Sequence, residues 1–209
     1  MKTLVLSAHP DLSSSIVNQK WFQALSNVAG VTTRDLSSVG GPEMRFDLTV
    51  EQSLLQNHDR IVLQFPFYWY SSPPVLKAWL DQVLLLGFAY GPGGNQLHGK
   101  ELGLAISTGG PADSFQAGAF NNFSMPELLT PFQQTALMVG MTYLPPFVLH
   151  SAMSRDQSKL NASVPSLISY ATERLLEPDP TMTRVASAEN AGTRWVIENS
   201  TAPDNPAAP

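Results

Sequence analysis

The sequence predicts an α/β fold, a three-layer sandwich in which helices cover both faces of a five-stranded parallel sheet. Short apolar segments alternate along the chain with segments whose apolar residues recur at helical spacing. Parallel strands need long crossover connections, which helices supply, so this alternation indicates a parallel sheet. The length of 209 residues, 43% of them hydrophobic, fits one domain with a full core.

The first two strand–helix units occupy the start of the chain. Residues 2–7 are apolar enough for a short buried strand, and residues 15–29 carry apolar side chains at helical spacing. Residues 31–36 alternate between apolar and polar and predict a second strand. Residues 49–57 predict a short helix with Thr49 as its N-cap.

The third and fourth units follow the same order. Residues 59–65 predict the third strand, which is apolar from Ile61 to Leu63. The proline pair at 73–74 opens the next helix, at a position where the missing N–H of proline costs least. Residues 102–107 predict the fourth strand, and a helix is expected near residues 131–139.

The fifth unit consists of a strand at 141–150, interrupted by two prolines at 145–146, and a helix near 164–176. Five such units predict a flavodoxin-like sandwich, which we assign to residues 1–177. Residues 178–209 are rich in Ala, Pro, Thr and Asn without a helical period, which predicts an irregular C-terminal tail.

Composition excludes several kinds of function. The chain has no cysteine, so disulfides, thiolate metal sites and a cysteine nucleophile are excluded, and redox chemistry would need a cofactor. A formal net charge of −5 without a basic cluster argues against nucleic acid as a partner. His58 and His150 have no clustered carboxylates around them, so no metal site is expected. The absence of a membrane-spanning run or signal peptide predicts a cytoplasmic protein.

The strongest functional signal is the loop after the third strand. It contains four aromatic residues and three prolines in the run Pro66-Phe67-Tyr68-Trp69-Tyr70-Ser71-Ser72-Pro73-Pro74. Open α/β sheets bind ligands at the carboxyl ends of their strands, where this loop is expected. Large flat side chains held by prolines suit a planar aromatic cofactor.

Two further loops are expected at the same edge of the sheet. After the first strand, His9 and residues 15–18 precede or open a helix, whose unpaired N–H groups suit a phosphate; an ordinary N-cap in a serine-rich loop is the alternative. After the fourth strand, Gly109 and Gly110 allow close approach of a ligand, or form only a structural turn. Together the three loops match the phosphate, ring face and ring edge of a flavin mononucleotide.

These segments resemble the flavodoxin-like NAD(P)H:quinone oxidoreductase family. Within it, the chain looks most like the flavoprotein ancillary subunits of glutathione-gated potassium-efflux antiporters. The segments that carry the resemblance are His9-Pro10, Ser15-x-x-Asn18, Pro66 to Trp79, Gly87-Phe88-Ala89-Tyr90-Gly91, Leu97-His98-Gly99-Lys100, Thr108-Gly109-Gly110 and Leu144-Pro145-Pro146-Phe147.

The resemblance implies a cofactor, a reaction and an assembly. The cofactor is FMN, with FAD as the alternative; the electron donor is NADPH or NADH, and the acceptor is a quinone. Members are homodimers that follow a ping-pong mechanism. The implied phosphate-binding residues are His9, Ser15, Ile16, Val17 and Asn18. The implied residues around the flavin ring are Pro66, Phe67, Tyr68, Trp69, Tyr70, Ser107, Thr108, Gly109 and Gly110.

One departure concerns the loop after the Thr-Gly-Gly motif. Some family members carry a tyrosine and a histidine there, but this chain has Phe115 and the run Gly118-Ala119-Phe120-Asn121. No titratable pair remains, so no catalytic residue can be assigned. We expect Phe115, Phe120 and Asn121 to line the substrate pocket.

Three functions stay open at this level. The first is a two-electron quinone reductase, and the second is a regulatory subunit of a membrane antiporter, peripheral at the inner face of the membrane, with flavin mainly structural. The third, a one-electron carrier, is disfavoured because such carriers are usually more acidic and lack the His-Pro pair. The sequence does not separate the first two.

Overall fold

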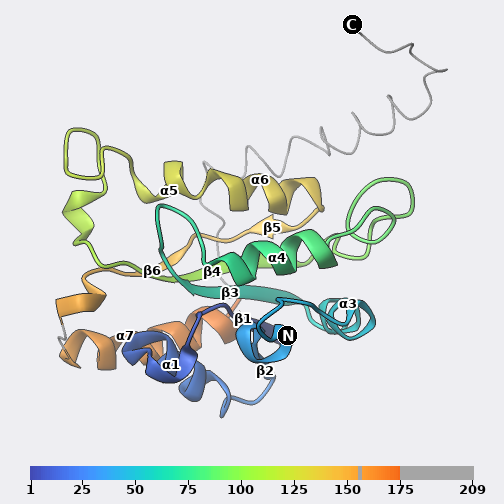
Figure 1. Cartoon of the computed structure of the whole chain (residues 1–209), viewed down its shortest axis with the longest axis horizontal. Helices are drawn as coiled ribbons and strands as arrows, with labels where there is room; N and C mark the ends of the chain where they lie inside the picture. The colour runs from blue at the N-terminus through green and yellow to red at the C-terminus, as the bar shows by residue number, and fades with distance from the viewer. Residues whose placement is uncertain (155–156, 175–209) are drawn as a thin grey trace, which may run out of the picture.

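A parallel β-sheet runs through the molecule, and helices cover both of its faces (Figure 1). The structure is a computed structural model that describes residues 1–154 and 157–174. The tail expected at 178–209 lies outside the described residues. Within them, the three-layer α/β sandwich predicted from the alternating pattern is confirmed.

All strand pairs in the sheet are parallel. The strands are β1 (Thr3–Ser7), β2 (Val31–Asp35), β3 (Arg60–Pro66), β4 (Glu101–Ser107), β5 (Thr142–Tyr143) and β6 (Phe147–Leu149). They are ordered β2-β1-β3-β4-β5, and β6 also pairs with β4. β5 and β6 are thus two parts of the fifth expected strand. The prolines at 145–146 lie between them. They interrupt the strand because a proline has no N–H to donate to a neighbouring strand.

The helices divide into two layers. They are α1 (Ile16–Leu25), α2 (Leu36–Gly40), α3 (Leu48–Gln56), α4 (Pro74–Val83), α5 (Met125–Leu128), α6 (Thr130–Met138) and α7 (Gln157–Thr172). α1 and α7 pack together on one face, below the sheet in Figure 1, while α4, α5 and α6 lie above it. Among the described residues, no helix is both long and apolar enough to cross a bilayer.

Several local expectations were wrong. The N-cap of α3 is Asp47, whose carboxylate accepts a hydrogen bond from the Val50 N–H at 3.2 Å, and Thr49 is inside the helix. α7 begins well before residue 164 and contains Pro165. The short helices α2 and α5 were not expected, because so few residues show no period.

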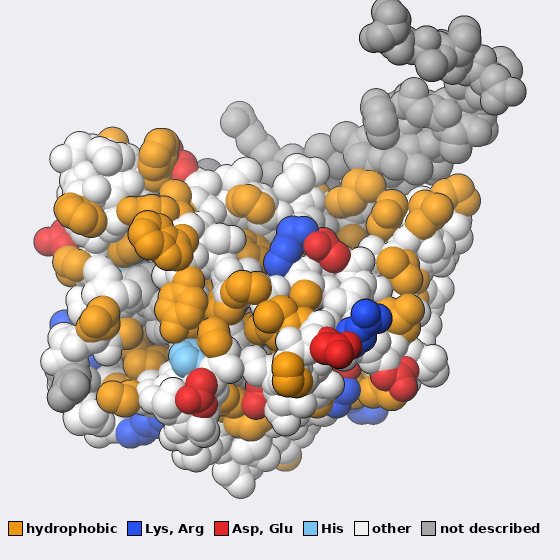
Figure 2. Space-filling view, in the orientation of Figure 1, with side chains coloured by type: hydrophobic (Ala, Val, Ile, Leu, Met, Phe, Trp, Pro, Cys, Tyr) orange, Lys and Arg blue, Asp and Glu red, His pale blue; other side chains and the backbone are white. Residues whose placement is uncertain are grey.

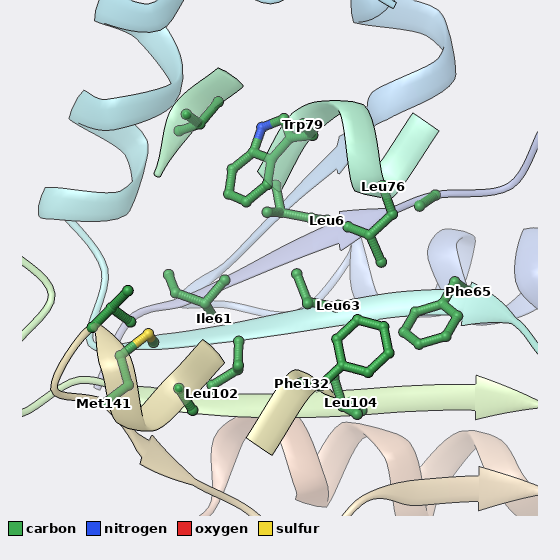
Figure 3. Packing of buried hydrophobic residues seen from close by; sticks show 14 of the residues in the cluster. Leu6, Ile61, Leu63, Phe65, Leu76, Trp79, Leu102, Leu104, Phe132 and Met141 are labelled. Carbon is green, nitrogen blue, oxygen red and sulfur yellow. The ribbon is translucent and has the colours of Figure 1, made fainter. Parts of the chain in front are cut away.

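Alternating side chains of the strands build a separate core on each face. On the α4–α6 face, Leu63 and Phe65 of β3 pack with Trp79 of α4 and Phe132 of α6 (Figure 3). On the other face, the intervening Val62 packs with residues of α1 and α7. This two-sided burial explains why the strands read as continuous apolar runs.

A buried carboxylate joins the second strand to two helices. Glu51 of α3 has a side chain that is only 1% exposed, and it pairs with the Arg34 guanidinium of β2 at 2.5 Å. Its second oxygen accepts a hydrogen bond from the Trp79 indole N–H of α4 at 3.0 Å. Both carboxylate oxygens are therefore satisfied, and β2, α3 and α4 are held in one arrangement.

We expect Arg34→Met to lower the free energy of unfolding by about 2 kcal/mol, because it leaves a buried carboxylate without its cation. Arg34→Met combined with Glu51→Gln should recover part of the loss, since glutamine still accepts from Trp79 and carries no charge. Urea unfolding followed by tryptophan fluorescence measures both variants. A double variant less stable than Arg34→Met alone would contradict this account.

Candidate functional site

The loops after β1, β3 and β4 meet at one edge of the sheet because their strands end in register. Ser7 pairs with Gln64, and Pro66 pairs with Ser107, so the carboxyl ends lie side by side. The loops after β3 and β4 lie at the left of Figure 1. The expectation that distant segments converge here is therefore correct in geometry.

The first turn of α1 offers unpaired backbone donors. Ser15 is the N-cap, and its hydroxyl accepts a hydrogen bond from the Asn18 N–H at 3.1 Å. The N–H groups of Ile16 and Val17 have no partner among the described residues. A helix N-terminus with free N–H groups and a partial positive charge favours an anion.

His9 connects this first loop with the aromatic loop. Its Nδ1 accepts a hydrogen bond from the Asp11 N–H at 3.1 Å, which leaves the Nε2 atom as the donor of the neutral ring. Partial burial lowers the pKa of His9, against the opposing negative charges of Asp11 and Asp35, and so favours the neutral ring. The His9 ring meets Tyr68 edge-on, with ring centroids 6.4 Å apart.

Side-chain amides fix the start of α1 against the end of β4. The Asn18 amide donates to the Ser107 hydroxyl at 3.1 Å, and the Gln64 amide donates to the Asn18 carbonyl at 2.9 Å. All three side chains are buried. The sequence did not single out Gln64, since no local pattern reveals a hydrogen bond between residues 46 positions apart.

The aromatic loop contains a strained hairpin turn. Tyr68 and Ser71 exchange two backbone hydrogen bonds of 3.1 and 3.0 Å, and the residues between them, Trp69 and Tyr70, have φ angles of 48° and 61°. Positive φ at both central positions is usual for Gly or Asn and costs bulky residues about 1–2 kcal/mol each. The turn leaves the Trp69 side chain 93% exposed. Strain of this kind points to a functional role for the two aromatics.

An open cleft of about 500 Å³ lies between this turn and the loop after β4. It is lined by Phe67, Trp69, Tyr70, Thr108, Gly109, Gly110, Pro111, Ser114, Phe115, Phe120 and Asn121. Figure 2 shows hydrophobic side chains exposed over the left side of the molecule, where these loops lie. The three residues expected to form a substrate pocket, Phe115, Phe120 and Asn121, all belong to this lining.

The remaining predicted residues lie next to the cleft or behind it. Pro66 and Ser107 are buried at the ends of β3 and β4. Tyr68 is in the same turn as Trp69 and contacts His9. The group at the start of α1 is linked to the cleft through Tyr68 and Ser107 rather than lining it.

A hydrogen-bonded chain connects the two walls of the cleft. The Tyr70 hydroxyl donates to the Asn121 side chain at 3.3 Å, and the Asn121 amide donates to the Ser114 hydroxyl at 2.8 Å. Phe67 contacts Tyr70 and Phe115 edge-on, with ring centroids 6.4 and 6.3 Å apart. The aromatic loop and the loop after β4 are therefore joined by side-chain contacts on both sides of the cleft.

In the glycine turn after β4, two carbonyls accept hydrogen bonds from a neighbouring segment, whereas the glycine N–H groups are unpaired among the described residues. The Thr108 carbonyl accepts from the Ala152 N–H at 2.9 Å, and the Gly110 carbonyl accepts from the Ser151 N–H at 3.0 Å. The N–H groups of Gly109 and Gly110 have no partner among the described residues. A Cβ on Gly110 would lie 3.0 Å from the Ser114 hydroxyl and 3.4 Å from the Phe115 ring.

The lining of the cleft contains aromatic, small and neutral polar residues, and no charged side chain. Its unpaired hydrogen-bond donors include the backbone N–H groups of Gly109 and Gly110. These features suit a flat, neutral ring system with several acceptor atoms on one edge.

Comparison with known proteins gives a consistent picture. A family described by its flavodoxin-like fold matches residues 1–169. General stress protein 14 of Bacillus subtilis is 48% identical over 85% of this chain and 96% of its own length. The NAD(P)H oxidoreductase YdeQ of Bacillus subtilis is 47% identical, over 85% of this chain and 90% of its own. The potassium-efflux ancillary protein KefG of Cronobacter sakazakii is 40% identical, over 76% and 86%.

Solved structures agree in fold. A general stress protein 14 from Treponema denticola, in complex with FMN, has a TM-score of 0.76, 36% identity, and coverage of 82% of this chain and 99% of its own. An NADPH-quinone reductase from P. pentosaceus has a TM-score of 0.76, 39% identity, and coverage of 83% and 99%. A protein described as a tryptophan halogenase from Streptomycin violaceusniger has a TM-score of 0.79, 44% identity, and coverage of 82% and 99%.

The strained turn generates a prediction about stability. Because Trp69 is almost fully exposed, its truncation removes little packing, and the backbone conformation decides the outcome. Trp69→Gly should have a free energy of unfolding about 1 kcal/mol higher than Trp69→Ala, since glycine adopts positive φ without strain. Thermal or urea unfolding of the two variants compares them directly, and equal stability would show that the turn carries no strain.

Proposed function

The chain belongs to the family with the flavodoxin-like fold, and from that premise we propose that it is an FMN-dependent NAD(P)H:quinone oxidoreductase. The observation that carries the proposal is the arrangement at the carboxyl edge of the sheet. There, unpaired backbone donors of α1, an exposed aromatic turn and a glycine turn surround an uncharged cleft. Phosphate, ring face and ring edge of FMN each find a chemically suitable partner.

The residues present fit FMN in detail. The N–H groups of Ile16 and Val17, with Ser15 and His9 nearby, would bind the phosphate without any arginine. Trp69 and Tyr70 would contact the isoalloxazine ring, and the free N–H groups of Gly109 and Gly110 would face its polar edge. The similar protein from Treponema denticola was solved with FMN, which favours FMN over FAD.

When bound, FMN supplies the redox chemistry, taking a hydride from NAD(P)H and passing two electrons to the acceptor. The chain's own contribution is to bind and orient the reactants. Phe115 and Phe120 would contact a flat acceptor, and Asn121 is held by Tyr70 and Ser114. An uncharged, aromatic cleft favours a neutral quinone, and nicotinamide and quinone would take turns in it, as in a ping-pong mechanism.

The names of several relatives support the reductase activity. Two of the curated relatives are named NAD(P)H oxidoreductases, and one solved structure is an NADPH-quinone reductase. The reductase activity is common to these names, whereas the halogenase description belongs to the solved structure from Streptomycin violaceusniger.

A second function is favoured by one specific observation. KefG of Cronobacter sakazakii, an ancillary protein of a glutathione-regulated potassium-efflux system, is 40% identical over 76% of this chain. In this reading the protein is a regulatory subunit that binds a membrane antiporter. Adding purified protein to antiporter vesicles and measuring potassium flux separates the two functions, since a reductase alone leaves the flux unchanged.

The purified protein, reconstituted with FMN, should be yellow and should oxidise NADH or NADPH with menadione as acceptor. Trp69→Ala should weaken FMN binding about tenfold, the scale of one lost aromatic contact. Phe123→Ala is the matched control, since Phe123 is 54% exposed but does not line the cleft. Fluorescence titration measures binding, and a protein that takes up neither FMN nor FAD would refute the proposal.

A further inference from the structure

His150 lies directly after β6 and touches the glycine turn from behind. Its Nδ1 is 3.0 Å from the Thr108 hydroxyl oxygen, and its ring packs against Phe115 with centroids 5.3 Å apart. The residue is partly buried and does not line the cleft. The proposed function assigns no role to this histidine.

The hydrogen bonds around Thr108 fix the direction of donation. A threonine hydroxyl has one hydrogen, and here it donates to the Gly110 carbonyl at 2.9 Å. The Thr108 oxygen must then accept from His150, so the proton of the imidazole is on Nδ1. The result is a relay from His150 Nδ1–H to the Thr108 hydroxyl to the Gly110 carbonyl.

The relay ends on the last peptide of the glycine turn, which joins Gly110 to Pro111. The Gly110 carbonyl also accepts from the Ser151 N–H, so two hydrogen bonds hold it in place. The Gly109 N–H lies in the peptide of the Thr108 carbonyl, which accepts from the Ala152 N–H, so both ends of the short segment that carries the free N–H groups of Gly109 and Gly110 are held by hydrogen bonds.

We propose that His150 is a positioning residue: through Thr108 it holds the Gly109-Gly110 turn in the conformation whose N–H groups face the ligand. That the ligand is FMN rests on the proposed function, but the relay itself does not. Partial burial lowers the pKa of His150, and no charged group contributes to that shift. Both the neutral Nδ1–H form and the protonated ring can donate to Thr108, so a change of protonation does not break the relay.

Two variants of His150 distinguish the effect of its hydrogen-bond donor from the effect of its aromatic ring. His150→Phe keeps a flat ring against Phe115 but has no donor, whereas His150→Asn places an amide nitrogen near the position of Nδ1. Thr108→Val removes the hydroxyl, and Thr108→Ser keeps it. In apo protein, amide hydrogen exchange at Ser151 and Ala152, which bond to the turn's carbonyls, should rise about tenfold in His150→Phe and Thr108→Val, the scale of one lost hydrogen bond.

The double variant His150→Phe/Thr108→Val should exchange no faster than either single variant, because both interrupt the same relay. His150→Asn and Thr108→Ser should remain near wild type. Exchange at Val62, in the centre of the sheet, serves as the folding control. Unchanged exchange in His150→Phe, or effects that add in the double variant, would overturn the inference. Should His150→Phe not fold, the Thr108→Val and Thr108→Ser pair decides the same question.

FMN titration gives the second readout. The dissociation constant should rise about tenfold in His150→Phe and stay within about threefold of wild type in His150→Asn. A wild-type protein that binds no flavin would refute the proposed function, while the exchange measurements on apo protein would still decide the role of His150. Faster exchange combined with unchanged FMN affinity would overturn the link between the turn and the ligand.

Discussion

The parallel pairing of β1, β3 and β4 is the constraint on which the rest of the structure depends. Their register brings Ser7, Pro66 and Ser107 to one edge, and every loop of the candidate site starts there. A shift of one residue would move every side chain of a strand to the opposite face and mismatch the packing of both cores. Since both faces of β3 are packed, with Leu63 on one and Val62 on the other, the register has no low-energy alternative.

The same edge concentrates interactions that serve no obvious purpose in folding. Trp69 and Tyr70 adopt a backbone conformation suited to glycine, and Trp69 is almost completely exposed. Gly109 and Gly110 leave their N–H groups unpaired among the described residues. The positive φ angles of Trp69 and Tyr70 cost stability at this edge, whereas the sheet and its two cores supply it elsewhere. This contrast between a rigid scaffold and a strained edge is what a binding site requires.

Much of this arrangement was predictable, because it follows from local patterns. Apolar runs and helical spacing predicted the strands and the longer helices, and the aromatic loop was recognisable from its composition. What remained hidden depends on contacts between distant residues. Gln64 with Asn18, and His150 with Thr108, are hydrogen bonds across 46 and 42 positions, which no periodicity encodes. Pro165 concealed the first half of α7, since proline inside a helix normally argues against it.

The unpaired donors that Gly109 and Gly110 offer to the cleft are main-chain amides, so this part of the binding capacity does not depend on the identity of a side chain. A substitution exchanges the side chain and keeps the amide, and only proline removes it. Phe115 and Phe120 can therefore change during evolution to suit new electron acceptors, while the backbone donors of the cleft are retained. Because the binding backbone is constant and the side chains of the cleft can vary, one fold can serve several related oxidants.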